Sequence, residues 1–446
     1  MNKAIILGAV GLASISAASP WVLGTVAEQQ FANAVEEIKQ SETAQLTLKE
    51  STFERGYASS VAKMVFHYDM TEYELPSFSM VVESQISQLP IASNPTGIYF
   101  FQLTSEDKIY FEDLPEEAQA LLNEYMGDVL LSGHSHVNVF GNGGTELSSN
   151  AIFFEDESAN SKVEISPIKI AYQGNVEGTD GKVTLSLDTL NLSDITGSIA
   201  LNGTHFDSVL AQDPSGLMVG SSAMNVSELK LVSPTLPLTL KDMVMTTNTE
   251  VVEEKLNTQV SYSIADIMSP IPVTTANYDI ELNGLSKEAL DLLEELNGQS
   301  EEYVMASLSD RQYLAKLLNA VMKPGLELNQ ELKLTAFGGQ VFADVDVKFL
   351  GLDDPESLMK QPGPEAIMKA INAYQANVHL KADNVAIMST PAAPAIARYI
   401  EQGFVVQTDT EVSSKILLKE GKLTINEREI PMEAVMQGLA AQLAEQ

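Results

Sequence analysis

Residues 182–187 read Lys-Val-Thr-Leu-Ser-Leu, a strict alternation of polar and apolar side chains. In an extended strand, successive side chains point to opposite faces, so Val183, Leu185 and Leu187 share one face and the polar residues share the other. A strand that is apolar on one face only is typical of an antiparallel sheet with one hydrated side, because strands of a buried parallel sheet are apolar on both faces. The segment therefore predicts half-buried antiparallel sheet.

The same alternation recurs over most of the chain after about Thr47. The clearest further runs lie at Leu236–Leu240, Tyr278–Leu282, Val341–Phe349 and Leu423–Ile425. Glycine-containing turn sequences lie between or ahead of such runs, where Asp-Gly and Asn-Gly pairs adopt positive φ at little cost. These turns are at Thr179–Lys182, Asn142–Gly144 and Glu420–Lys422. The pattern predicts long strands joined by hairpins.

Helical patterns are interspersed among these strands, mostly in the C-terminal half. Ser286 is a suitable N-cap for one helix, and Ser309 begins a capping-box spacing for the next. The predicted helices are Glu116–Gly127, Ser286–Asn297, Ser309–Lys323, Pro364–Tyr374, Pro391–Gln402 and Pro431 to the end. The sequence thus predicts an α+β fold that is predominantly antiparallel β, with long strands and several amphipathic helices.

The N-terminal segment has no charged residue from Ala4 through Ala27. About 20 apolar residues span a bilayer as a helix, and Lys3 before the run favours a cytoplasmic N-terminus. We predict a retained signal anchor over residues 1–27, because Pro20 disfavours cleavage just before it and the apolar residues continue to Val26. A cleaved signal peptide, with small residues at Ser16–Ala18, remains the alternative.

The length of 446 residues favours more than one compact unit. A turn sequence at Asp213–Gly216 marks a boundary. We therefore predict a strand-rich N-terminal domain over residues 28–215 and an α+β C-terminal domain over residues 216–446.

The composition excludes several classes of function. Lys and Arg number 26 against 61 Asp and Glu, and the net charge of −35 repels nucleic acid. The chain has no cysteine, which excludes thiolate nucleophiles, iron–sulfur clusters, thiolate zinc sites and disulfides. No glycine-rich phosphate loop is present, so the sequence predicts no nucleotide cofactor.

The densest candidate for chemistry is Gly133–Val137, which contains His134 and His136. Two residues apart on a strand, the imidazoles point to the same face and suit one zinc ion, but the sequence does not identify a third ligand. Ser-x-x-Lys matches at Ser166–Lys169 and Ser227–Lys230 lie in strand-like sequence and lack the partner motifs of penicillin-interacting enzymes. We therefore assign no catalytic, cofactor-binding or metal-binding residue.

Two patches resemble a known family. Phe53–Ala62 is similar to the aromatic, Gly, Ser and Ala signature that follows the anchor in the YdgA-like family of gammaproteobacterial envelope proteins (domain of unknown function 945). Gly421–Asn426 is similar to that family's closing Gly-Lys-Leu-Thr-Leu-Asn-Gly, with Glu427 in place of the last Gly. The resemblance implies a protein held at the inner membrane with its body in the periplasm, and it carries over no catalytic residue.

The first patch also has a physical interpretation. Gly56 permits a tight turn, and Phe53 and Tyr57 are expected to pack against other residues. Ser59, Ser60 and Ala62 are small enough for close approach of backbones. We expect a structural role for this patch.

These observations predict a membrane-anchored, non-enzymatic periplasmic protein that binds a partner protein or a hydrophobic or lipid ligand on extended sheet. A long sheet with an apolar inner face, as in bacterial lipid-bridging proteins, suits acyl chains by analogy of fold. Two alternatives stay open. One is an envelope hydrolase that uses carboxylates or His134 and His136, and the other is a purely structural homo-oligomer.

Overall fold

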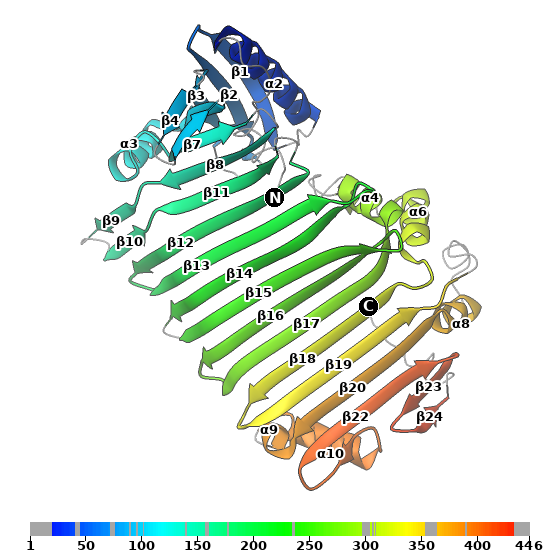
Figure 1. The fold of residues 1–446 in the computed structure, drawn as a ribbon. Helices are drawn as coiled ribbons and strands as arrows, with labels where there is room; N and C mark the ends of the chain where they lie inside the picture. Colours follow the sequence, from blue (N-terminus) through cyan, green and yellow to red (C-terminus); the bar gives the residue numbers. More distant parts are fainter. Residues whose placement is uncertain are drawn as a thin grey trace. The chain divides into compact units, whose positions relative to one another are not determined.

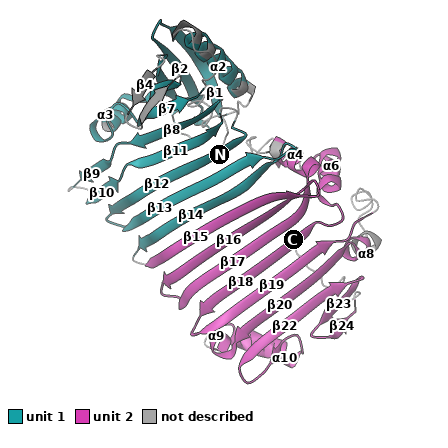
Figure 2. Ribbon diagram, viewed as in Figure 1, with its two compact units in different colours: residues 1–234 teal, residues 235–446 magenta. Residues whose placement is uncertain are grey.

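A computed structural model of the chain describes most of its residues (Figure 1). The described residues are 20–40, 45–71, 76–88, 91–94, 97–100, 102–138, 141–156, 160–175, 178–233, 237–296, 304–305, 307, 309–352, 364–388 and 390–431. They fall into two compact units, residues 1–234 and 235–446 (Figure 2). The segment around residue 215, where the sequence predicts a domain boundary, forms the turn between β13 and β14 within unit 1.

Unit 1 is an antiparallel sheet in which strands pair in the order β1-β2-β3-β6-β7-β8-β11-β12-β13-β14. β10 pairs with the second half of β12 and with β9, and β4 pairs only with β5. The strands are β1 (Leu46–Arg55), β2 (Ser59–Tyr68), β3 (Phe78–Ser87), β4 (Ile91–Asn94), β5 (Gly97–Phe100), β6 (Leu103–Glu112), β7 (Leu131–Val137), β8 (Asn142–Ser149), β9 (Ile152–Asp156), β10 (Ser161–Ile165), β11 (Ile168–Asn175), β12 (Asp180–Asp194), β13 (Gly197–Gln212) and β14 (Met218–Val232).

The strands of unit 2 are also antiparallel, paired in the order β15-β16-β17-β18-β19-β20-β22-β23-β24. The short strand β21 pairs with the start of β22. The strands are β15 (Leu238–Val252), β16 (Lys255–Met268), β17 (Val273–Ser286), β18 (Glu327–Ala336), β19 (Gly339–Phe349), β20 (Tyr374–Asp383), β21 (Val406–Gln407), β22 (Glu411–Lys419), β23 (Lys422–Ile425) and β24 (Arg428–Ile430). The expected predominance of long antiparallel strands is confirmed in both units.

Five of the predicted helices form within two residues of their expected ends. They are α3 (Glu116–Tyr125), α4 (Lys287–Leu296), α6 (Arg311–Val321), α8 (Pro364–Asn372) and α10 (Ala393–Glu401). The short helix α9 (Asn384–Met388) was not predicted, and the helix expected after Pro431 lies outside the described residues.

The predicted N-cap is confirmed for α4, whereas α6 has a different N-cap residue. The Ser286 hydroxyl accepts a hydrogen bond from the Ala289 amide at 3.2 Å, as expected of an N-cap. In α6 the cap is Asp310 rather than Ser309, and its carboxylate accepts from the Gln312 amide at 2.9 Å. The negative charge of a carboxylate next to the first free amides of a helix also interacts favourably with the helix dipole.

The helix α2 (Pro20–Gln40) overlaps the predicted signal anchor and corrects its extent. Leu23 and Ala27 are buried, together with Phe31 and Ile38, in a core shared with β2, β3 and β6. The last part of the predicted anchor, residues 20–27, thus belongs to the folded body, while residues 1–19 lie outside the described residues. Within the part of the chain that the structure describes, no helix combines the length and apolarity needed to cross a membrane.

The patch Phe53–Ala62 joins α2 to the sheet. The rings of Phe53 and Phe31 lie 5.5 Å apart, and the Arg55 guanidinium donates to the Thr25 hydroxyl at 2.7 Å and contacts the Glu28 carboxylate at 3.3 Å. The expected structural role of the patch is therefore visible in its contacts. One expectation is wrong: Tyr57 is 72% exposed at the turn between β1 and β2.

Burial of α2 leads to a prediction about stability. Replacing Phe31 with alanine leaves a cavity between α2 and β1, and we expect the free energy of unfolding to fall by about 3 kcal/mol. Urea unfolding of the full chain, followed by the fluorescence of Trp21, measures this change. The exposed neighbour Asn33 supplies the control, since Asn33→Ala is expected to change stability by less than about 0.5 kcal/mol. Equal stability of the two variants would contradict the packing of α2.

Candidate functional site

Apolar side chains of neighbouring strands in unit 1 lie in rows across the sheet. The register makes successive cross-strand partners of Leu147, Ile170, Leu185, Phe206 and Met224, on β8, β11, β12, β13 and β14. Partners directly opposite each other in a sheet lie on the same face. We call the face that carries this row the apolar face of unit 1.

Two further rows run parallel to the first near the other end of the long strands. One joins Ile165, Leu190, Leu201 and Leu229, and the next joins Val163, Leu192, Ile199 and Leu231. Along each of β12, β13 and β14, the apolar residues have odd numbers on one side of a certain position and even numbers on the other side. These positions lie next to each other across the three strands. Asp188, Gly203 and Ser227, at these positions, are missing from the pairing, and Gly203 has φ of +62°. Because a backbone irregularity with positive φ reorients the side chains that follow it, we infer that the apolar positions continue on one face.

The apolar face of unit 1 is covered at one end and open at the other. Leu147 and Ile170 adjoin the core that α2 forms with the first strands. Farther along the face, Met224 is 36% exposed and Ile199 is 44% exposed, while Leu185 and Phe206 are half-buried. The described helices of unit 1 make their main contacts with β1, β2 and β9. The aliphatic rows on β12–β14 therefore face outward.

Unit 2 has an apolar face of the same construction. One row joins Tyr262, Tyr278, Leu332, Ala343 and Leu380, on β16–β20. The adjacent row joins Val260, Ile280, Gln330, Val345, Val378 and Ile416. Tyr262 is 41% exposed and Leu380 is 42% exposed, and the rest of the two rows is half-buried. No residue in these rows carries a charge.

Helices of unit 2 lie at the ends of its strands. α4 and α6 form a small core with Leu285, Leu256 and Leu326 at one end of β16, β17 and β18, and α9 contacts β19 and β20. In Figure 1, α4 and α6 lie beside one set of strand ends, and α9 and α10 lie beside the opposite ends of β19, β20 and β22. The middle of the apolar face is left open by the described helices.

A buried carboxyl group interrupts the apolar face of unit 1 near α2. Asp107 on β6 is 2% exposed; the Ser135 hydroxyl donates to its carboxyl group and lies 2.9 Å from the Thr145 hydroxyl. Burial raises the pKa of Asp107, and the hydrogen bond from Ser135 opposes this shift. The second carboxyl oxygen has no partner among the described residues. Asp107 is therefore a buried carboxyl group with hydroxyl groups beside it, on the face that carries the apolar rows.

The opposite face of each sheet is polar and charged. In unit 1 the Lys182 ammonium lies 3.0 Å from the Asp207 carboxylate, across β12 and β13, and its hydrogen bond holds the pKa of Asp207 below the ordinary value. In unit 2 the Lys348 ammonium pairs with the Glu327 carboxylate across β19 and β18. These exposed pairs contribute little to stability, but they show which face is hydrated.

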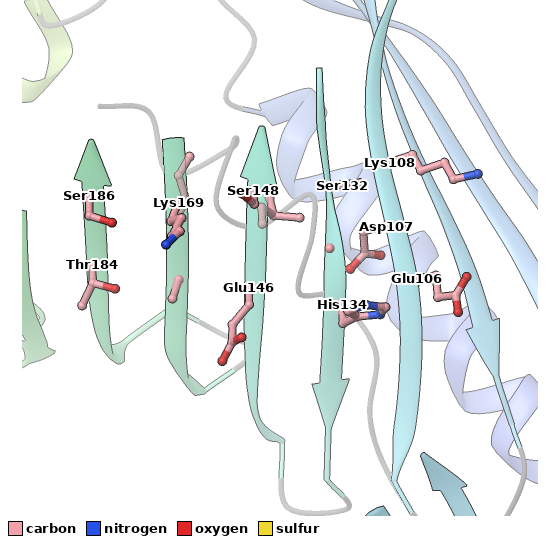
Figure 3. A pocket seen from close by; sticks show the side chains of 14 residues that line it. Glu106, Asp107, Lys108, Ser132, His134, Glu146, Ser148, Lys169, Thr184 and Ser186 are labelled. Atoms are coloured by element: carbon pink, nitrogen blue, oxygen red, sulfur yellow. The ribbon is translucent and has the colours of Figure 1, made fainter. Parts of the chain in front are cut away.

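The predicted histidine pair lies on this polar face, and the two rings line different hollows. His134 lies between Glu106 and Glu146 of the neighbouring strands and lines a hollow of about 590 Å³, shown in Figure 3. His136 lines a smaller hollow of about 290 Å³. Burial lowers the pKa of His136, and the Glu146 carboxylate partly offsets this. Both rings point to the same side of β7, as expected.

The geometry around these histidines does not form a metal centre. In the described ranges of the chain, no three or more His, Cys, Asp or Glu side chains gather closely enough to hold a metal ion. The Ser-x-x-Lys matches do not form such a site either, since Lys169 lines the hollow beside His134 but Ser166 does not. Ser166 precedes β11, where its hydroxyl accepts a hydrogen bond from the Thr189 amide at 2.9 Å, and Ser227–Lys230 lies along β14.

Comparison with known proteins assigns the chain to a family. The model of a family described as "Bacterial protein of unknown function (DUF945)" matches residues 1–433. The chain belongs to this family. The predicted membership of the DUF945 family is thereby confirmed. No curated protein and no solved structure matches the chain.

Sequence reasoning found the alternation that builds the apolar faces but not the residues that remain open on them. Met224 and Leu380 occupy ordinary alternating positions, and only the placement of the helices distinguishes them from core residues. Asp107 was also missed, since a single carboxylate in a polar run, Ser105–Lys108, gives no sign of burial.

The raised pKa of Asp107 leads to a prediction about pH. Its folded-state pKa lies above the unfolded value of about 4, so the protonated form favours folding, and this contribution is lost as pH rises from about 4 through the folded-state pKa. The side chain of the Asp107→Asn variant does not titrate. As pH rises from 4 to 8, we therefore expect the urea midpoint of the unmodified protein to decrease relative to the midpoint of the variant. Parallel pH profiles of the two proteins would contradict a buried, titrating Asp107.

Proposed function

We propose that the protein binds the acyl chains of lipids on the apolar faces of its two units. The observation that carries this proposal is the exposure of uncharged aliphatic rows along strands of 10 to 16 residues, with Met224 and Ile199 as examples in unit 1 and Leu380 in unit 2. Soluble monomers rarely leave extended apolar patches open, and such patches mark binding surfaces. Covering them removes apolar area from water at about 25 cal/mol per Å².

The chemistry of the faces favours acyl chains over a protein partner. Protein interfaces concentrate Trp, Tyr and Arg in central pockets, surrounded by a polar rim. Here the rows are mostly Leu, Ile, Val and Ala, and they continue from strand to strand without a charged position. A flexible hydrocarbon chain conforms to such a surface without needing matched hydrogen bonds.

The location expected from the sequence fits this proposal. A body held at the inner membrane, with its sheets in the periplasm, has access to membrane lipids. The location is itself part of the proposal and is tested by fractionating cells and by protease access to the body.

Site-specific photocrosslinking in cells tests lipid binding with the full chain. A photoreactive amino acid at Phe206, on the apolar face of unit 1, is expected to capture lipid, which mass spectrometry identifies. Met224→Glu places a charge directly opposite Phe206, and desolvating a carboxylate under an acyl chain is costly, so we expect capture to fall at least about tenfold.

Asn225 provides the matched control, because it neighbours Met224 on β14 but points to the polar face. Asn225→Glu should leave capture by residue 206 unchanged, and a photoreactive residue at position 225 should capture no lipid. Crosslinks from residue 206 to a second copy of the chain or to another protein, in place of lipid, would refute the proposal and support the homo-oligomer or partner-protein alternative.

A further inference from the structure

Three polar side chains lie together on the apolar face of unit 2. Tyr262 and Tyr278 are direct cross-strand partners, with ring centroids 6.5 Å apart and planes inclined by 19°. The Tyr278 hydroxyl donates a hydrogen bond to the Gln330 side-chain oxygen at 3.1 Å. We call these three residues the tyrosine–glutamine cluster.

The surroundings of the cluster are apolar. Gln330 is paired with Ile280 on one side and with Val345 on the other, and Tyr278 is paired with Leu332. The charged residues of β18, Glu331 and Lys333, occupy the alternate positions that face the other side of the sheet. The cluster is therefore a small group of neutral polar side chains with aliphatic side chains around it.

Two groups of the cluster that can donate hydrogen bonds have no partner among the described residues. Gln330 uses its side-chain oxygen to accept from Tyr278, and its amide NH₂ group makes no hydrogen bond with any described residue. The hydroxyl of Tyr262 makes none with the described residues either. Covering such donors with pure hydrocarbon, without a partner, costs about 1–3 kcal/mol for each. A ligand that lies over this position is favoured if it brings a hydrogen-bond acceptor.

We propose that the tyrosine–glutamine cluster binds the ester carbonyl of an acyl lipid and so selects acylated lipids over ether-linked ones. This inference rests on the proposed function and names the ligand group recognised at one position of the same face. A carbonyl oxygen is a neutral acceptor joined directly to an acyl chain, so it satisfies Tyr262 or Gln330 while the chain lies on the adjoining row of Val260 and Ile280. A phosphate is disfavoured there because the two rows that contain the cluster carry no cationic side chain among the described residues.

A matched pair of lipids tests the proposal. The full-length protein is titrated with a fluorescent diacyl phospholipid and with its dialkyl ether analogue, which has the same chains and head group. The unmodified protein is expected to bind the diacyl lipid about tenfold more tightly than the ether lipid. Gln330→Leu combined with Tyr262→Phe should abolish the preference while retaining affinity for the ether lipid, which also shows that the variant is folded.

Gln259→Leu is the control, since Gln259 lies on β16 but faces the polar side of the sheet. This variant should keep the full preference for the diacyl lipid. Equal binding of the two lipids by the unmodified protein, or a preference that survives in the double variant, would overturn the carbonyl site and leave acyl-chain binding standing. Binding of neither lipid would overturn the proposed function as well.

Discussion

The backbone hydrogen-bond register between adjacent long strands is the constraint on which the rest of the structure depends. Each strand alternates apolar and polar residues, but alternation alone does not bring the apolar side chains of different strands together. The antiparallel ladders do so, by placing Leu185 opposite Phe206 and Val345 opposite Val378. A shift of one residue in any pair would move its apolar side chains to the hydrated face. The register thus creates continuous apolar faces from separate strands.

Apolar faces are stabilised when other groups shield them from water. The described helices cover only part of these faces. In unit 1, α2 lies over the first strands, and the patch Phe53–Ala62 holds it there through a ring contact and an arginine pair. In unit 2, α4 and α6 bury one end of the strands. The remaining aliphatic rows are open to solvent in the described residues, and this uneven coverage is the physical basis for proposing an external ligand.

Polar groups on the apolar faces have different consequences according to their surroundings. Asp107 lies under cover, and the network of hydroxyl groups around it compensates only partly for its desolvation. The tyrosine–glutamine cluster lies on an open surface, where its free donors can remain hydrated until a ligand arrives. A buried polar group affects the stability of the fold, whereas an exposed one on an apolar surface affects which ligand the surface prefers.

The sequence by itself determined the antiparallel class of the sheets and the positions of most helices, because periodicity and capping are local properties. It also identified the family through two short patches. Only the tertiary structure decided that residues 20–27 pack into the body, that Tyr57 is exposed, and that His134 and His136 line separate hollows. These outcomes depend on contacts between segments far apart in the chain, such as Arg55 with Thr25, and no local pattern records them. For the same reason, alternation predicted the apolar faces, while the arrangement of helices around the sheets decided which parts of those faces stay open.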